Sequence, residues 1–278
     1  MGSRFVDSLF LPLIEAGTVV LGAMLFAILT MACEVGFRVG RRRGRTIKKS
    51  EEETSATSTL TAGMLALLAF MLGLTIDFAQ NRFEARRDRV AEEATTIDTA
   101  WSRAKLIGGP EGEAMAALIA DYAKTRLDFT GADYRGPVPA LIARTEAQKN
   151  AIWALATEAA RKSPTPVMAT LVTALNSMFD AALSQRFAFD GRVPGDMIDM
   201  LIVGSMLAIG AMGYELGLGG IRQPVLSSLL LIMWTGGLVM TVDLELPRRG
   251  DIRVETAPLQ WVIESFAKAP PGAPAPRP

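Results

Sequence analysis

Residues 60–89, LTAGMLALLAFMLGLTIDFAQNRFEARRDR, join an uncharged apolar segment to a highly charged one. The apolar segment Thr54–Ile76 is long enough to cross a bilayer core, which takes roughly 20 residues in a helix. From Asp77 to Ile107 the chain contains neither proline nor glycine, and apolar residues recur there at helical spacing: Phe83, Val90, Ala94, Ile97 and Trp101. We therefore expect one unbroken helix that starts in the membrane and continues into an aqueous domain.

Three other uncharged runs accompany this helix, at Ala16–Cys33, Met200–Tyr214 and Gln223–Val242. The run at Met200–Tyr214 becomes long enough to span only when it is extended to Met197–Ile221. The sequence thus predicts an all-α membrane protein with four transmembrane helices in two pairs and a helical extramembrane domain. The second helix continues into that domain.

Turn signals and composition divide the chain further. We expect a first transmembrane pair in residues 1–80, the helical domain in 81–195, a second pair in 196–246 and a C-terminal tail in 247–278. Within the domain, helices are expected near residues 111–129, at 138–162, and from Pro166, capped by Thr165, to about Phe189. The Pro/Ala-rich end, residues 269–278, is expected to be disordered.

The composition argues against several functional classes. Lys plus Arg and Asp plus Glu number 29 each, so the neutral net charge gives no support for a nucleic-acid partner. The chain has no His and a single cysteine, Cys33, which argues against metal or other cofactor sites. It also lacks a GxSxG motif and a phosphate loop, so we expect no enzymatic activity. The expected partners are the lipid bilayer, inorganic ions and further copies of the chain.

The second helix carries the candidate pore-lining residues. Gly63, Phe70 and Asp77 recur at seven-residue spacing on one face, with Gly73 and Phe78 nearby. A ring of Phe70 side chains from several subunits would form a hydrophobic constriction that gates by dewetting. The alternative is that this aromatic side chain packs against protein or lipid.

Charged residues near the ends of the apolar runs allow two interpretations. One group is expected at the ends of the membrane helices on the side of the helical domain. It comprises Asp199, Asp243, Arg82, Arg86, Arg248 and Arg249. They could form an acidic vestibule or a proton relay, because ionisable groups near the membrane usually face water or protein partners. Alternatively, each marks a helix end and takes part in a charge pair. At the other end, Glu34 is expected near Arg38 and Arg222.

Glycine pairs four residues apart occur in the first and third predicted membrane helices. Gly36 and Gly40 are expected to close the first crossing, and Gly213 and Gly217 lie in the third. Small residues at this spacing let two helix backbones approach closely, so we expect a packing role for both pairs.

Four segments carry a resemblance to a known family. They are EVGFRVGRRR at 34–43, residues 72–94 of the second helix, LNSM at 175–178 and DLELPRRGDIRV at 243–254. Up to about residue 262 the chain resembles the bestrophin-like DUF4239 membrane proteins. A further architectural likeness to the bestrophin anion channels implies a homo-oligomeric, anion-permeable pore lined by the second helix. The alternative is a non-conducting scaffold or sensor whose helical domain binds a protein through faces around Phe83, Trp101 and Trp153.

The expected location is the cell membrane, as a multi-pass protein. The basic loop at residues 38–49 predicts a cytoplasmic position for that loop, because short cytoplasmic loops carry the excess of Lys and Arg. This places the helical domain and both termini on the extracytoplasmic side. The arginines that follow the second crossing, and the likeness to bestrophins, favour the opposite orientation.

Overall fold

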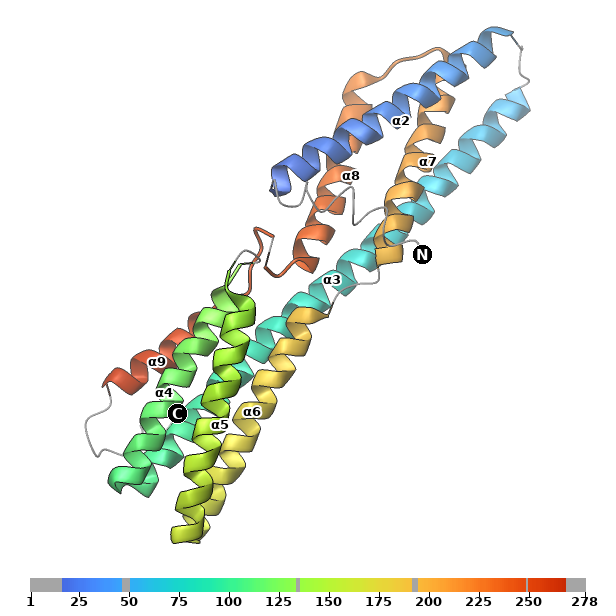
Figure 1. Cartoon of the computed structure of the whole chain (residues 1–278). Coiled ribbons are helices and arrows are strands. Elements are labelled where there is room, and N and C mark those ends of the chain that lie inside the picture. Colours follow the sequence, from blue (N-terminus) through green and yellow to red (C-terminus); the bar gives the residue numbers. More distant parts are fainter. Residues whose placement is uncertain (1–16, 47–50, 134–135, 192–194, 249, 269–278) are drawn as a thin grey trace. The chain divides into compact units, whose positions relative to one another are not determined.

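One helix, α3, runs from Glu51 to Ile107 and accounts for 57 residues of the chain. The computed structural model describes residues 17–46, 51–133, 136–191, 195–248 and 250–268 (Figure 1). In those residues the structure is all helical, and besides α3 it contains α2 (Thr18–Thr46), α4 (Gly109–Gly131), α5 (Val138–Lys162), α6 (Pro166–Asp190), α7 (Gly195–Gly219), α8 (Pro224–Glu245) and α9 (Ala257–Lys268). The all-α prediction is confirmed.

The continuous second helix predicted from the sequence is also confirmed. It ends where two glycines adopt positive φ angles, +66° at Gly108 and +65° at Gly109. This backbone region is strained for residues with a side chain, so the glycine pair allows the chain to reverse into α4. The chain forms two compact units, residues 1–81 with 192–252 and residues 82–191 with 253–278, and α3 belongs to both.

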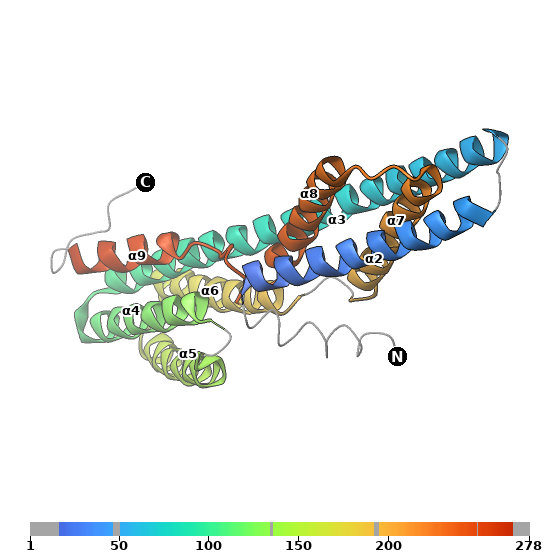
Figure 2. The ribbon, with the colours of Figure 1, turned by 90° about the horizontal axis from the view of Figure 1, so that it is seen from above.

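The first unit contains α2, α7, α8 and the N-terminal part of α3 (Figure 2). Its core is apolar and includes Leu25, Leu29, Leu72 and Ile209. The buried indole of Trp234 in α8 donates a 2.8 Å hydrogen bond to the Ser205 hydroxyl in α7, which satisfies the one polar group of that side chain. The outer surfaces of these helices are rich in exposed large apolar residues, as expected for lipid contact.

Glycines form the contact between α2 and α7. A Cβ atom added at Gly40 would lie 2.1 Å from the Tyr214 carbonyl oxygen, and one at Gly217 would lie 2.2 Å from that of Phe37. Gly36 and Gly213 meet the opposite helix as closely, at 2.0 and 2.1 Å. The predicted packing role of these pairs is confirmed. Both Gly36 and Gly40 lie within α2, and the helix continues beyond them to Thr46.

The second unit packs α4, α5, α6 and α9 with the C-terminal part of α3 around a separate apolar core. A polar group lies inside it: the fully buried Glu93 carboxylate pairs with Arg126, which also contacts the Gln185 side-chain oxygen. The Gln185 amide donates to the Thr130 hydroxyl at 2.9 Å, so the network links α3, α4 and α6. Burial beside this network raises the pKa of Tyr122. Removing one partner of such a pair is costly, because an uncompensated buried charge remains.

Helix α9 lies in the part of the chain predicted to be a tail. Leu259 is fully buried, and the Phe266 ring stacks on Trp101 of α3 with 4.4 Å between ring centroids. The tail from residue 253 to residue 268 therefore belongs to the second unit, and Leu259 is part of its core. The predicted disorder of residues 269–278 lies outside the described residues.

Five described helices are long and apolar enough to cross a membrane, namely α2, α3, α6, α7 and α8. The sequence predicted four, without α6. In α6, 44% of the most apolar window is buried inside the protein, against 17% in α2 and α3. Its apolar side chains, including Leu171, Leu175 and Met178, are part of the second unit's core. The apolar character of α6 is therefore explained by packing within that unit.

The glycine contact gives a first prediction. Gly40→Ala is expected to destabilise the protein by about 1–3 kcal/mol or more, because the new methyl group meets a backbone carbonyl that cannot move without separating the helices. The measurement is the thermal unfolding midpoint of the purified protein in detergent.

Gly236→Ala in α8 is the matched control, since a Cβ atom at that position meets nothing within 4 Å. Replacing an unconstrained helical glycine by alanine is expected to be neutral or to stabilise by about 0.5–1 kcal/mol. Equal unfolding midpoints for the two variants would contradict the proposed role of Gly40.

Candidate functional site

One face of α3 in the first unit has no partner within the described chain. It carries all five residues that the sequence proposed as pore-lining: Gly63, Phe70, Gly73, Asp77 and Phe78. The Phe70 side chain is 63% exposed and that of Phe78 is 49% exposed. Cβ atoms added at Gly63 and Gly73 would meet no other atom within 4 Å. We call these five residues the α3 open face.

The opposite side of the same helix is packed. Leu68, Leu72, Thr75 and Ala79 are buried, with exposed fractions of 9%, 8%, 2% and 0%. At ~100° per residue, Gly63, Phe70 and Asp77 lie about half a turn from this buried side, and Gly73 and Phe78 lie to either side of them. One side of α3 is therefore attached to the unit's core while the other is available for contact.

The α3 open face differs in character from the exposed face of α8. The exposed residues of α8 are mainly large and apolar, such as Leu226, Leu229 and Met233, and no charged residue occurs between Pro224 and Val242. The same side of α3 also exposes large apolar residues, such as Leu67 at 65% and Leu74 at 40%, but it adds glycines and the Asp77 carboxylate. Asn81, one turn later, donates a 3.1 Å hydrogen bond to that carboxylate. Large apolar residues suit a lipid contact, whereas small and ionisable ones suit contact with protein or water.

Asp243, expected at a vestibule or in a charge pair, is only 5% exposed and holds a turn after α8. Its carboxylate accepts hydrogen bonds from the backbone amides of Asp251 at 2.8 Å and Ile252 at 2.9 Å. A Cβ atom at Gly250 would lie 2.5 Å from this carboxylate, so the turn requires glycine there. These contacts bring together both ends of the DLELPRRGDIRV segment, and they give Asp243 a structural role.

Arg86 also lies within the protein. Its guanidinium, 1% exposed, donates to the carbonyl oxygens of Ala188 at 3.1 Å and Gly191 at 3.0 Å. These carbonyls lie at the C-terminal end of α6, where the helix itself provides no hydrogen-bond donors. The other members of the predicted set are less buried: Arg82, Asp199 and Arg248 are half-buried, and Arg249 lies outside the described residues. Asp243 and Arg86 therefore each have structural partners within their own unit.

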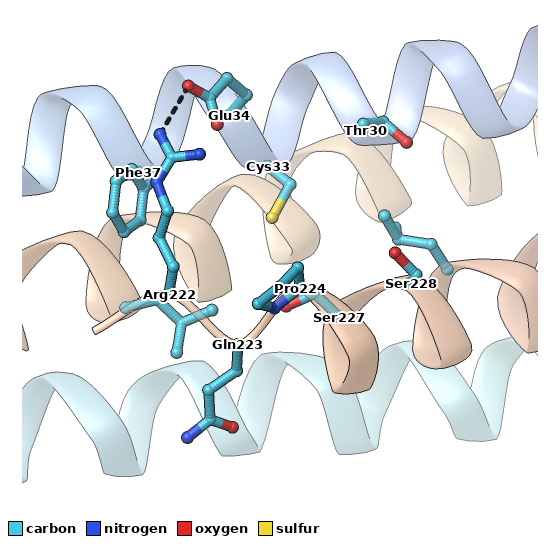
Figure 3. Close-up of a pocket in the computed structure, with 11 residues that line it drawn as sticks. Thr30, Cys33, Glu34, Phe37, Arg222, Gln223, Pro224, Ser227 and Ser228 are labelled. Carbon is cyan, nitrogen blue, oxygen red and sulfur yellow. Dashed lines mark hydrogen bonds and ion pairs between the residues drawn. The ribbon is translucent and has the colours of Figure 1, made fainter. Parts of the chain in front are cut away.

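The predicted contact of Glu34 with two arginines is confirmed. Glu34 accepts from Arg38 at 2.9 Å on its own helix and from Arg222, between α7 and α8, at 3.2 Å (Figure 3). Glu34 and Arg222 line a pocket that was not predicted from the sequence. A sequence alone gave little indication of it, because the pocket joins α2 to residues almost 200 positions later in the chain.

The three aromatic residues proposed as partner-binding have different environments. Trp101 is 7% exposed and covered by Phe266, so the expectation that it lies on a docking face is wrong. Phe83 is partly buried against the second unit's core. Trp153 is 40% exposed and remains accessible. The sequence could not show that Trp101 is covered, because the covering helix α9 was not predicted.

Comparison with known proteins identifies a family. The family model described as the Bestrophin-like domain matches residues 26–259 of the 278-residue chain. No curated protein and no solved structure matches. The family match spans most of the chain and confirms the resemblance, so the chain belongs to the Bestrophin-like domain family.

Proposed function

We propose that this Bestrophin-like protein is a homo-oligomeric ion channel in which the α3 open face lines the pore. The observation that carries the proposal is the placement of Gly63, Phe70 and Asp77 opposite the packed side of α3. Copies arranged around an axis would bring these faces together. The small residues would leave space for a conduit, and the Phe70 rings would narrow it.

The proposed crossings are α2, the apolar part of α3, α7 and α8. All four contribute residues to the first unit, and their exposed surfaces are rich in large apolar residues. Helix α6 is assigned to the extramembrane domain because its apolar residues are needed in the second unit's core. The proposal includes no enzymatic activity.

Family membership supports anions as the conducted ions. Asp77 acts against anions, because carboxylates that face a pore attract cations. We therefore propose an anion-permeable pore whose selectivity is limited by the Asp77 ring.

Current through the reconstituted protein tests the channel. Purified protein in a planar bilayer is expected to give discrete conductance, and Phe70→Ala is expected to raise open probability or unitary conductance because the hydrophobic constriction becomes wider. Phe187→Ala is the matched control, since Phe187 is 66% exposed but lies on α6, outside the pore. Absence of current across salts and voltages, or equal effects of both substitutions, would contradict the channel.

Charge selectivity gives a separate prediction. Asp77→Asn is expected to shift the reversal potential in a salt gradient toward the anion equilibrium potential, because it removes one negative charge per subunit from the pore. Asp190→Asn is the control, since its side chain is 73% exposed and it lies at the end of α6. An unchanged reversal potential in Asp77→Asn would place this carboxylate outside the conduction path.

A non-conducting scaffold or sensor is the second candidate function. It is favoured by the exposed aromatic side chains of the second unit, Trp153 at 40% and Phe187 at 66%. Such residues are common at the centres of protein interfaces. In this case the recordings described above would show no conductance in any variant.

We further propose that the basic end of α2 is cytoplasmic and the helical domain extracytoplasmic, because positive charge is retained inside. In a Cys33→Ala background, Ser163→Cys between α5 and α6 is expected to react with an impermeant maleimide in intact cells. Thr46→Cys at the end of α2 is expected to react only after lysis. The reverse pattern would overturn this orientation.

A further inference from the structure

A pocket of about 180 Å³ lies at one end of the first unit, where α2, the end of α7 and the start of α8 meet. Figure 3 shows Cys33 and Glu34 projecting from α2 toward Arg222 and the first residues of α8. The pocket lies where the apolar segments of α2 and α8 reach charged residues. In a membrane protein this position corresponds to the level of the lipid headgroups.

Arg222 is the cationic group of this pocket and is held in a defined position. Its guanidinium lies 4.5 Å from the centroid of the Phe37 ring and donates to Glu34 at 3.2 Å. The side chain is nevertheless 59% exposed. A guanidinium has five N–H donors in a planar arrangement that suits bidentate binding of phosphate. Arg222 is therefore positioned to bind an anion while retaining its contact with Glu34.

Two hydroxyl groups lie on the α8 side of the pocket, and Figure 3 shows Ser228 at the end away from Arg222. Ser227 and Ser228, in the first turns of α8, line the same pocket, and no hydrogen bond from either hydroxyl is formed within the described residues. Hydroxyls can donate to phosphate oxygens. The carboxylate of Glu34 opposes an anion, but Arg38 and Arg222 both pair with it, so the three side chains together carry one positive charge.

Part of the pocket wall is apolar and continues onto the lipid-facing surface. Leu216 and Leu231 line the pocket. Val225 and Leu226, next to it on α8, are 70% and 63% exposed. A ligand with a phosphate group and a hydrocarbon portion therefore fits this site better than a free anion, because its two parts match the two kinds of wall.

The end of α2 adds positive charge beside the pocket. Arg41, Arg42, Arg43 and Arg45 are exposed, and none forms an ion pair with another residue in the described part of the chain. Each Lys or Arg near an anionic membrane surface contributes about 1 kcal/mol of attraction. This cluster would concentrate anionic lipids at the pocket, while Arg222 would bind one of them.

We propose that this pocket binds the phosphate group of an anionic phospholipid, with Arg222 as the donor and the acyl chains along the exposed face of α8. The site is separate from the α3 open face. It would exist in a channel or in a non-conducting scaffold.

Alkylation of Cys33 tests the proposal, because this single cysteine lines the pocket. In detergent, the full-length protein is treated with a small thiol reagent while phosphatidylglycerol, phosphatidylcholine or inorganic phosphate is added. Phosphatidylglycerol is expected to slow the reaction in a saturable manner, and the other two additives to have little effect. Equal protection by phosphatidylcholine would overturn the requirement for negative charge, and equal protection by inorganic phosphate would replace the lipid by a free anion.

Two variants test whether protection of Cys33 by phosphatidylglycerol depends on Arg222. Arg222→Gln is expected to raise the phosphatidylglycerol concentration for half-protection by roughly tenfold, because hydrogen bonds to charged groups are among the stronger ones. Arg42→Gln removes the same charge from the same end of the protein but not from the pocket, and should change this concentration by less than about threefold.

A second measurement guards against misfolding of Arg222→Gln. Arg222→Lys, which retains the charge, is examined with it by native mass spectrometry. Retention of one phosphatidylglycerol molecule is expected in the order wild type, Arg222→Lys, Arg222→Gln. Equal retention in all three, or equal losses in Arg42→Gln and Arg222→Gln, would overturn the proposed site.

Discussion

In the hydrocarbon core of a membrane, every backbone amide and carbonyl must be hydrogen-bonded within the protein, and a helix achieves this by itself. The same hydrogen-bond pattern continues through α3 as the helix passes from an uncharged segment to one rich in Arg, Asp and Glu. The two parts of α3 differ in the core into which their buried side chains pack. Leu68 and Leu72 pack in the first unit, whereas Val90 and Ile97 pack in the second. One helix can therefore belong to two cores without a break in its backbone.

Helix packing is achieved differently in the two units. Between α2 and α7 the absence of side chains at Gly40 and Gly217 lets the backbones meet directly, which suits a setting where lipid removes most of the hydrophobic driving force. In the second unit the helices are linked by large apolar residues and by the Glu93–Arg126 pair. Such a pair is costly to bury and adds specificity through its geometry, because Gln185 must also be in place.

Features that depend on neighbouring residues in the chain were predictable from the sequence, whereas most contacts between distant residues were not. Hydrophobic runs and the Gly108–Gly109 turn correctly placed most helices, and the bounds of α5 match the prediction. Helix α9 was missed because its sequence follows a proline- and arginine-rich turn, and its apolar side chains gain meaning only from the Trp101 surface that they cover. The seven-residue spacing of Gly63, Phe70 and Asp77 predicted a shared face, but its accessibility depends on which side of α3 packs against α7 and α8. The partners of Asp243 and Arg86 were not predictable either, because they are backbone groups brought close by the turns.

Several charged residues have a structural role, which leaves fewer of them as candidates for a functional role. Asp243 binds two backbone amides, Arg86 binds two carbonyl groups, and Arg126 is paired inside a core, so each is accounted for by folding. Asp77 and Arg222 differ from these residues because they combine exposure with a position at the end of an apolar segment. The Asp77 carboxylate on the α3 open face suits the proposed ion path between subunits. The Arg222 guanidinium, beside an apolar wall, suits the proposed lipid headgroup. The proposed contacts with ions and with lipids would therefore use opposite charges at different places, Asp77 on α3 and Arg222 in the turn between α7 and α8.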